Sequence, residues 1–120
     1  MAKILLIDDE VAVLHSMSVV MHSDRHEIVT ISDSAKALDI VKAGDYDLIV
    51  TDIRMSPVDG MQILKLAHDT HPSKPVIVVS AYGSDATVQQ CLALGCKAYI
   101  RKPFKVQTVQ DAVEKALAGK

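Results

Sequence analysis

The feature that most constrains this chain is a set of short apolar runs that recur along it. They cover residues 4–7, 28–31, 48–50, 76–79 and, more weakly, 98–100, and Thr30 interrupts the second run. The runs are continuous rather than alternating, which is typical of strands buried on both faces under covering helices. They therefore predict five strands of a parallel sheet.

Segments with a helical period separate these runs, because apolar residues recur in them at three- and four-residue steps. The segments contain Val11, Leu14, Met17 and Met21; Ala37, Leu38 and Val41; Met61, Leu64 and Ala67; Val88, Cys91 and Leu92; and Val109, Ala112, Val113 and Leu117. This alternation predicts a three-layer α/β fold with five helices and right-handed crossovers. A doubly wound sheet of order 2-1-3-4-5 suits five such strands, although periodicity alone does not choose the order. Predicted helix starts have Ser34, Ser84 and Thr108 nearby, and Gly44, Gly95 and Gly119 lie just past predicted ends.

Length and composition restrict the class of protein. The 120 residues (13.0 kDa) form one domain's worth of chain, so we expect a single domain over 1–120. A net charge of -2 provides no basic field for direct binding of nucleic acid. No apolar run approaches the roughly 18 residues that span a membrane. Cys91 and Cys96 are too few for a disulfide scaffold, and we interpret them as small buried hydrophobes in a cytoplasmic protein.

Polar residues with complementary chemistry follow the predicted strands. Asp8 and Asp9 come after the first strand, Asp52 after the third, Ser80 after the fourth and Lys102 after the fifth. In open α/β sheets the ligand crevice lies beyond the carboxyl ends of the strands. The three carboxylates would converge there and repel one another unless a cation binds or one proton is retained. Their hard oxygen atoms suit Mg²⁺.

A metal ion, the Lys102 ammonium and the Ser80 hydroxyl would together suit a transferring phosphoryl group, and a carboxylate could be its nucleophile. Each residue also has a simpler interpretation. Asp8 and Asp9 alone would more often cap a helix, Ser80 alone would cap a turn, and Lys102 alone would be a solvated surface residue. Their coincidence at successive strand ends favours a phosphoryl-transfer site.

These residues carry a resemblance that covers essentially the whole chain. Asp8-Asp9, Asp52-Ile53-Arg54-Met55, Ser80-Ala81 and Lys102-Pro103-Phe104 resemble the receiver domain of two-component response regulators. The resemblance implies a flavodoxin-like fold and a place in a phosphorelay. It implies that Asp52 accepts a phosphoryl group from the phosphohistidine of a sensor histidine kinase or phosphotransfer protein.

The resemblance also implies roles for the surrounding residues. Asp9 and Asp52 would bind Mg²⁺ (or Mn²⁺) directly, Asp8 through water, and Arg54 through its backbone carbonyl. Lys102 and Ser80 would hold the phosphoryl oxygens, and Lys102-Pro103 would be a cis peptide. Ser80 and Tyr99 would switch the face formed by the fourth helix, fifth strand and fifth helix, although Tyr99 could simply pack under a helix. We expect Arg54 and Tyr82, two residues beyond Asp52 and Ser80, to slow hydrolysis of the phosphorylated form.

The switched face would control an output domain in a longer chain or a separate effector, and a phosphorylation-dependent homodimer is a further expectation. The chain departs from the family in Met55-Ser56-Pro57, where the proline stands one place later than the usual Met-Pro, although the distance to Gly60 is kept. This leaves open the path of the loop between the third strand and the third helix.

Three alternatives compete with this interpretation. A haloacid-dehalogenase-type aspartyl phosphatase or phosphotransferase would want Asp-x-Asp after the first strand, where this chain has adjacent acids. A flavin or dinucleotide binder would need an anion-binding loop there, and no Gly-x-Gly-x-x-Gly is present. An unphosphorylated receiver-like scaffold would keep the carboxylates for metal binding or stability.

The histidines, which we interpret as surface residues, complete no metal site. They are His15, His22, His26, His68 and His71.

Overall fold

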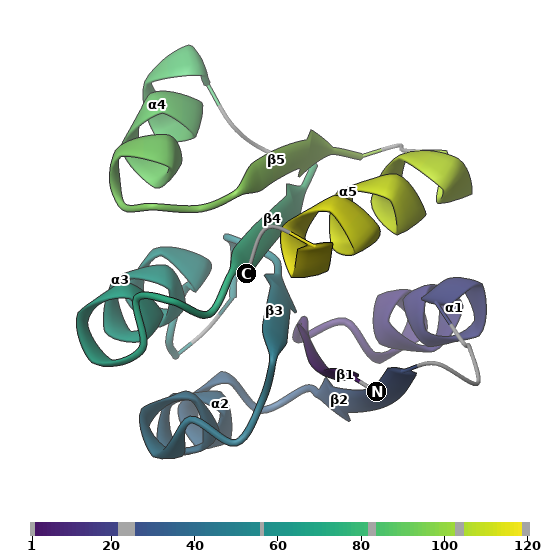
Figure 1. Ribbon diagram of the computed structural model, residues 1–120, viewed down its shortest axis with the longest axis horizontal. Coiled ribbons are helices and arrows are strands. Elements are labelled where there is room, and N and C mark those ends of the chain that lie inside the picture. The colour runs from purple at the N-terminus through teal and green to yellow at the C-terminus, as the bar shows by residue number, and fades with distance from the viewer. Residues whose placement is uncertain (1, 22–25, 56, 82–83, 103–104, 119–120) are drawn as a thin grey trace.

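Five strands alternate with five helices along the chain (Figure 1). The computed structural model describes residues 2–21, 26–55, 57–81, 84–102 and 105–118. The elements are β1 (Ala2–Ile7), α1 (Val11–Met21), β2 (His26–Ile31), α2 (Ser34–Ala43), β3 (Leu48–Thr51), α3 (Gly60–Thr70), β4 (Val76–Ser80), α4 (Asp85–Ala93), β5 (Ala98–Arg101) and α5 (Val106–Ala118). Each predicted strand and helix is present, and every strand extends one or two residues beyond its apolar run.

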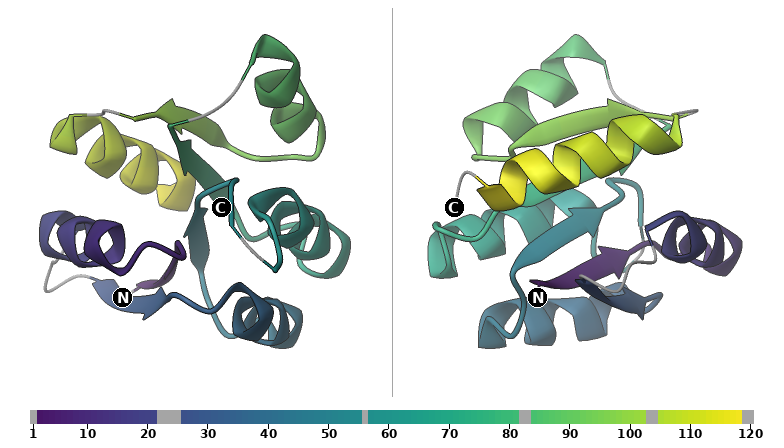
Figure 2. Two further views of the ribbon diagram at one scale, coloured as in Figure 1. Left: turned by 180° about the vertical axis from the view of Figure 1, so that it is seen from behind. Right: turned by 45° about the vertical axis from the view of Figure 1, so that its right-hand side comes forward.

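The strands form one parallel sheet in the order β2-β1-β3-β4-β5. This confirms the predicted doubly wound order. Helices α1 and α5 cover one face of the sheet, and α2, α3 and α4 cover the other (Figure 1). The view from behind in Figure 2 shows the same three layers.

Side chains of β1 alternate between two hydrophobic cores. Ile4 and Leu6 pack with α1 and α5, whereas Leu5 and Ile7 pack with α2, α3 and α4. The described residues of β3 and β4 are all buried. The expectation that all five runs are buried on both faces is wrong for β2 and β5, which keep exposed or half-buried residues because they form the two edges of the sheet.

The helix ends follow capping chemistry. Ser84 is the N-cap of α4, as expected, but Asp33 rather than Ser34 caps α2. The Asp33 carboxylate accepts the backbone N–H groups of Ala35 and Lys36. Gly44 and Gly95 have φ angles of 77° and 98°, the left-handed conformation that favours glycine after a helix. The expectations for Ser34, Ser84, Gly44 and Gly95 are therefore confirmed, since Ser34 is the first residue of α2. Thr108 lies inside α5, which begins at Val106, and Gly119 lies outside the described residues.

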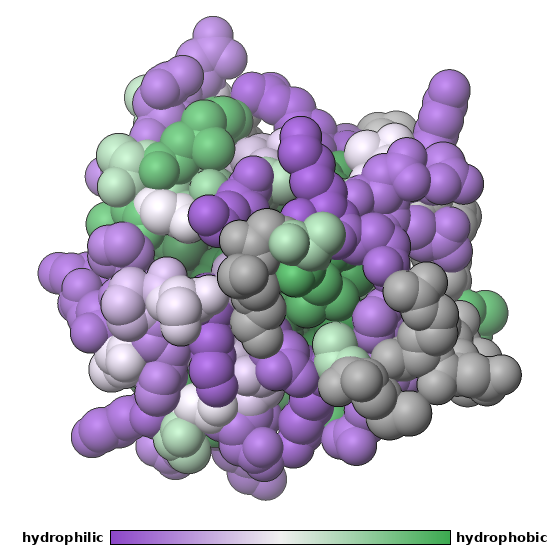
Figure 3. Space-filling model, viewed as in Figure 1, coloured by the Kyte–Doolittle hydropathy of each residue, from purple (hydrophilic) through white to green (hydrophobic). Residues whose placement is uncertain are grey.

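Hydrophilic residues cover most of the face seen in Figure 3, and hydrophobic residues gather toward its upper left, in the region of α4. Three large hydrophobic residues are exposed: Leu92 of α4 (45%) and, on α1, Val11 (68%) and Val19 (63%). Among the described residues, no helix is long and apolar enough to cross a membrane.

Candidate functional site

Hydrogen bonds that continue the sheet beyond its strands bring Asp8 and Asp52 together. The backbone N–H of Asp8 donates to the Ile31 carbonyl (3.2 Å), and that of Asp52 donates to the Ile7 carbonyl (3.0 Å). Each aspartate therefore directly follows a strand, and the two strands, β1 and β3, are neighbours. Both residues are buried, with 3% of Asp8 and 7% of Asp52 exposed.

Lys102 joins the two carboxylates. Its Nζ lies 3.2 Å from Asp8 Oδ2 and 3.4 Å from Asp52 Oδ2. Its backbone N–H donates to the Ser80 carbonyl (2.9 Å), which fixes the lysine beside the end of β4. Two carboxylates facing one ammonium leave an excess negative charge in a largely buried place. Such a charge favours a further cation or a transferring group with electrophilic character.

Burial and the neighbouring charges shift the pKa values of Asp8 and Lys102. Burial raises the pKa of Asp8, and the Asp52 carboxylate adds to this rise, while the Glu10 N–H (2.9 Å from Asp8 Oδ1) and Lys102 oppose it. Burial acts to lower the pKa of Lys102, but the Asp52 and Asp8 carboxylates outweigh it, so the pKa of Lys102 is raised. The lysine therefore stays positively charged between the two aspartates.

The acceptor candidate Asp52 is fixed on its other side by backbone groups. Its Oδ1 accepts the Ile53 N–H (2.6 Å), and its carbonyl accepts the Thr51 hydroxyl (2.9 Å). Gly60 donates its N–H to the Ile53 carbonyl (2.8 Å). A Cβ atom placed on Gly60 would lie 1.9 Å from the Asp52 carbonyl oxygen, so only a glycine fits there without a shift of the backbone.

Asp9 and Arg54 lie on the exposed side of the same region. Both side chains are exposed and line a depression of about 520 Å³ together with Ile53, Met55 and Asp59. The described part of the chain contains no group of three or more His, Cys, Asp or Glu residues close enough to hold a metal. The convergence of three carboxylates therefore stays a prediction, whereas that of Asp8 and Asp52 is observed. The oxygen donors and excess negative charge fit a hard divalent cation.

The two predicted switch residues meet at the end of β4. Ser80 is fully buried, Tyr99 of β5 is half-buried, and the two side chains share a hydrogen bond. Burial raises the pKa of Tyr99, and the hydrogen bond with Ser80 opposes that rise. The switch role of Tyr99 stays a prediction. Tyr82 and Pro103 lie outside the described residues, so their expected roles, including the Lys102-Pro103 cis peptide, stay predictions.

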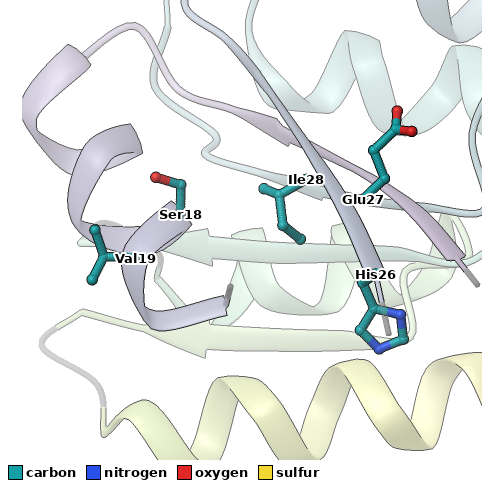
Figure 4. Close-up of a pocket in the computed structure, with 5 residues that line it drawn as sticks. All are labelled: Ser18, Val19, His26, Glu27 and Ile28. Carbon is teal, nitrogen blue, oxygen red and sulfur yellow. The ribbon is translucent and has the colours of Figure 1, made fainter. Parts of the chain in front are cut away.

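The histidine predictions need one correction. His26 is half-buried rather than fully on the surface, since its side chain is only 11% exposed and its Nε2 lies 2.8 Å from Glu114 Oε1 of α5. His26 also lines a depression of about 640 Å³ with Ser18, Val19, Glu27 and Ile28 (Figure 4). This depression lies at the beginning of β2, whereas Asp8, Asp52 and Lys102 follow the ends of strands. It is therefore separate from the candidate site.

Two hydrogen bonds around the site were not foreseen. Ser34 lies at a helix start, as expected, and its hydroxyl also accepts the buried Val58 N–H (3.1 Å). Thr51 was not singled out, and its hydroxyl bonds the Asp52 carbonyl. A serine one position after an aspartate N-cap could have signalled that its hydroxyl serves another segment, but no local pattern identifies Val58 as the partner.

Comparison with known sequences identifies the family. The sequence profile of the response regulator receiver domain matches residues 4–114. Sporulation initiation phosphotransferase F of Bacillus subtilis (strain 168) is 30% identical over 115 residues, which are 96% of this chain and 93% of that protein. The response regulator protein FleR of Pseudomonas aeruginosa is 29% identical over 118 residues, 98% of this chain. The chain spans only 25% of FleR and 26% of the transcriptional regulatory protein ZraR of Escherichia coli (strain K12).

Solved structures agree with the fold. A response regulator receiver domain protein from Clostridium thermocellum superposes with a TM-score of 0.91 at 30% identity, covering 99% of this chain and 96% of that one. A CheY-like receiver domain protein from Methanospirillum hungatei JF-1 has a TM-score of 0.92 at 24% identity, covering 99% and 95%. With the family profile, these likenesses show that this chain belongs to the response regulator receiver domains of two-component signalling and has their CheY-like, flavodoxin-like fold.

Proposed function

We propose that this receiver domain is a phosphorylation-driven switch in which Asp52 is the phosphoryl acceptor. The observation that carries the proposal is the buried Asp52 carboxylate, held between the Lys102 ammonium and the Ile53 N–H beside a second buried carboxylate, Asp8. The donor would be the phosphohistidine of a sensor histidine kinase or of a phosphotransfer protein.

In the proposed reaction an Asp52 carboxylate oxygen attacks the phosphorus atom of the phosphohistidine. The new O–P bond forms an acyl phosphate, the N–P bond breaks, and the imidazole leaves with the electron pair of that bond. Lys102 leaves its ion pairs with the aspartates to bind a phosphoryl oxygen, and the Ser80 hydroxyl binds another. The chain acts only on itself and turns over no separate substrate.

Asp8, Asp9, Asp52 and the Arg54 carbonyl would hold Mg²⁺ or Mn²⁺, which would neutralise negative charge on the phosphoryl group and the carboxylates. Because Asp8 and Asp52 share a single lysine, the site has excess negative charge for this cation to balance. Asp9 and Arg54 line the open depression through which the phosphodonor would approach. Arg54 and Tyr82 would slow the entry of the water that hydrolyses the acyl phosphate.

The output would follow from the Ser80 and Tyr99 pair. When the Ser80 hydroxyl turns to the phosphoryl group, its hydrogen bond with Tyr99 is lost and Tyr99 adopts a new position. The face of α4, β5 and α5 would then change its affinity for an output domain, a separate effector or a second copy of the chain. The long relatives that this chain matches over a quarter of their length favour an output domain, and phosphotransferase F, matched over 93%, favours a separate partner.

The test is the intact mass of the protein after incubation with acetyl phosphate and Mg²⁺, with Asp52→Asn as the matched control. We expect one labile phosphoryl adduct on the wild-type chain and none on the variant. If the folded wild-type chain refuses both acetyl phosphate and a kinase phosphohistidine, the chain is an unphosphorylated receiver-like scaffold and the proposal is wrong.

A further inference from the structure

Ser34 makes a buried hydrogen bond that the helix it begins does not need. It is the first residue of α2 and only 1% exposed. Asp33 already caps this helix by accepting the Ala35 and Lys36 N–H groups. The Ser34 Oγ instead accepts the backbone N–H of Val58 at 3.1 Å, across 24 residues of sequence. The hydroxyl therefore links α2 to the loop between β3 and α3.

Val58 needs this acceptor. Its side chain packs in the hydrophobic core and it is only 8% exposed, so its N–H is withheld from water. A buried N–H without a partner is strongly unfavourable. The preceding residue is Pro57, the proline displaced from its usual place in the family motif. The hydroxyl of Ser34 thus supplies the hydrogen-bond acceptor for the Val58 N–H, next to the place where the sequence departs from the family.

A short series of contacts leads from this loop to Asp52. Asp59 follows Val58 and caps α3 in a reciprocal capping box with Gln62. Gly60 then donates to the Ile53 carbonyl (2.8 Å), with its Cα packed against the Asp52 peptide. A Cβ atom at Gly60 would lie only 1.9 Å from the Asp52 carbonyl oxygen, so the two backbone segments are closely packed at this contact. A shift of Val58 would therefore displace the peptide that carries Asp52.

We propose that Ser34 is a positioning residue for the phosphoryl acceptor, acting through Val58 and Gly60 on Asp52. The proposal rests on the proposed function of Asp52. The hydroxyl of Ser34 bonds the Val58 N–H, so in this proposal it acts on Asp52 through the loop. Removing the hydroxyl should lower the rate of phosphorylation more than it changes the affinity for the donor.

The experiment compares Ser34→Ala with Val41→Ala, both on the full chain. Val41 is a fully buried α2 residue in the same core, and it makes no hydrogen bond to the loop through its side chain. Initial rates of adduct formation are measured by intact mass over a range of acetyl phosphate concentrations at fixed Mg²⁺. We expect Ser34→Ala to lower the maximal rate about tenfold, the loss expected when a reacting group is less well aligned. The half-saturating acetyl phosphate concentration should stay within about twofold.

Val41→Ala should leave the maximal rate within about twofold of wild type although it lowers the thermal midpoint at least as much as Ser34→Ala does. Ser34→Cys, which keeps the size of the side chain but accepts hydrogen bonds weakly, should reproduce the rate loss. Amide hydrogen exchange gives a readout that does not depend on phosphorylation. We expect the Val58 and Gly60 amides to exchange faster in Ser34→Ala and to be unchanged in Val41→Ala.

Equal rate losses in Ser34→Ala and Val41→Ala would overturn the positioning role, as would an unchanged rate in Ser34→Ala. Unchanged exchange at Val58 and Gly60 would overturn it as well. A wild-type chain that forms no adduct dependent on Asp52 would instead overturn the proposed function, so the two failures are distinguishable.

Discussion

Helices α3 and α4 cover the same face of the sheet but are attached to it very differently (Figure 2). α3 buries Gly60, Ile63, Leu64 and Ala67 and begins with a reciprocal capping box. Within α4, all of whose residues the structure describes, only Cys91 is buried. α3 is therefore held by a stripe of side chains over two turns, and α4 by one small residue and its caps.

The difference separates the part of the molecule that must stay fixed from the part that can move. In our proposal the loop into α3 aligns Asp52, and a displaced acceptor would lose reactivity. α4 lies next to β5, which carries Tyr99, and it contributes little burial to resist a shift. Segments that move in switching proteins have low local stability, and the sparse burial of α4 is consistent with this condition. The contrast supports the proposed switching face.

The largest expected effect tests the close packing at the start of α3. Gly60→Ala should lower the free energy of unfolding by more than about 3 kcal/mol. The alanine Cβ would lie 1.9 Å from the Asp52 carbonyl oxygen, and relieving this clash requires a shift of the backbone. Gly95→Ala, beyond α4, should cost about 1 kcal/mol: its φ of 98° is strained for alanine, but the atom it meets is on the exposed His68 ring. Urea unfolding measures both. Equal losses would contradict the comparison.

A second pair of variants compares the packing of the two helices. Ile63→Ala in α3 should lower the free energy of unfolding by about 3 kcal/mol, since it empties a fully buried site. Cys91→Ala in α4 should cost about 1 kcal/mol because a smaller group is removed. Guanidinium titrations followed by circular dichroism give both values. The idea that α4 is weakly held would fail if Cys91→Ala proved as costly as Ile63→Ala.

A third prediction uses the thiols at the end of α4. The Gly95 N–H donates to Leu92 and the Cys96 N–H to Cys91, the paired bonds of a Schellman motif that brings both cysteines into the core. Burial raises the pKa of Cys96 from 9.0 to about 11. The thiol of the unfolded chain ionises first as the pH rises, so stability is complete below pH 9 and falls between about pH 9 and 11.

At pH 10 this thiol should contribute a loss of about 1 kcal/mol relative to pH 8. Cys96→Ala should show a correspondingly smaller fall between the two pH values, and it serves as the control for other groups that titrate there. Urea midpoints at pH 8 and pH 10 measure the difference. A variant that loses as much stability as the wild type would refute the assignment.

The smallest expected effect concerns Tyr46, in the core shared with α2 and α3. Its ring is buried and its hydroxyl has no hydrogen-bond partner among the described residues. Tyr46→Phe should change the free energy of unfolding by less than about 1 kcal/mol, and toward greater stability, because a buried polar group that lacks a partner is removed. Thermal unfolding of the two proteins is the measurement. A clear destabilisation would reveal a partner for the hydroxyl.

The sequence predicted most of the secondary structure for a local reason. The apolar runs and helical stripes alternate with periods that belong to strands and helices, so the elements of β1 to α5 could be located before any contact was known. The same holds for Gly44 and Gly95, whose positive φ angles were foreseeable from residue type. Edge strands β2 and β5 were misjudged because an apolar run does not reveal how many neighbours a strand has.

For the site, the sequence by itself determined which side chains stand at the ends of the strands, because their place after each apolar run is a matter of order along the chain. Only the tertiary structure decided how they pair. Hydrogen bonds join Lys102 to Asp8, Glu114 to His26, and Ser34 to Val58, across 94, 88 and 24 residues of sequence respectively. These bonds depend on which strands become neighbours and how helices pack on them, and no local pattern contains that information.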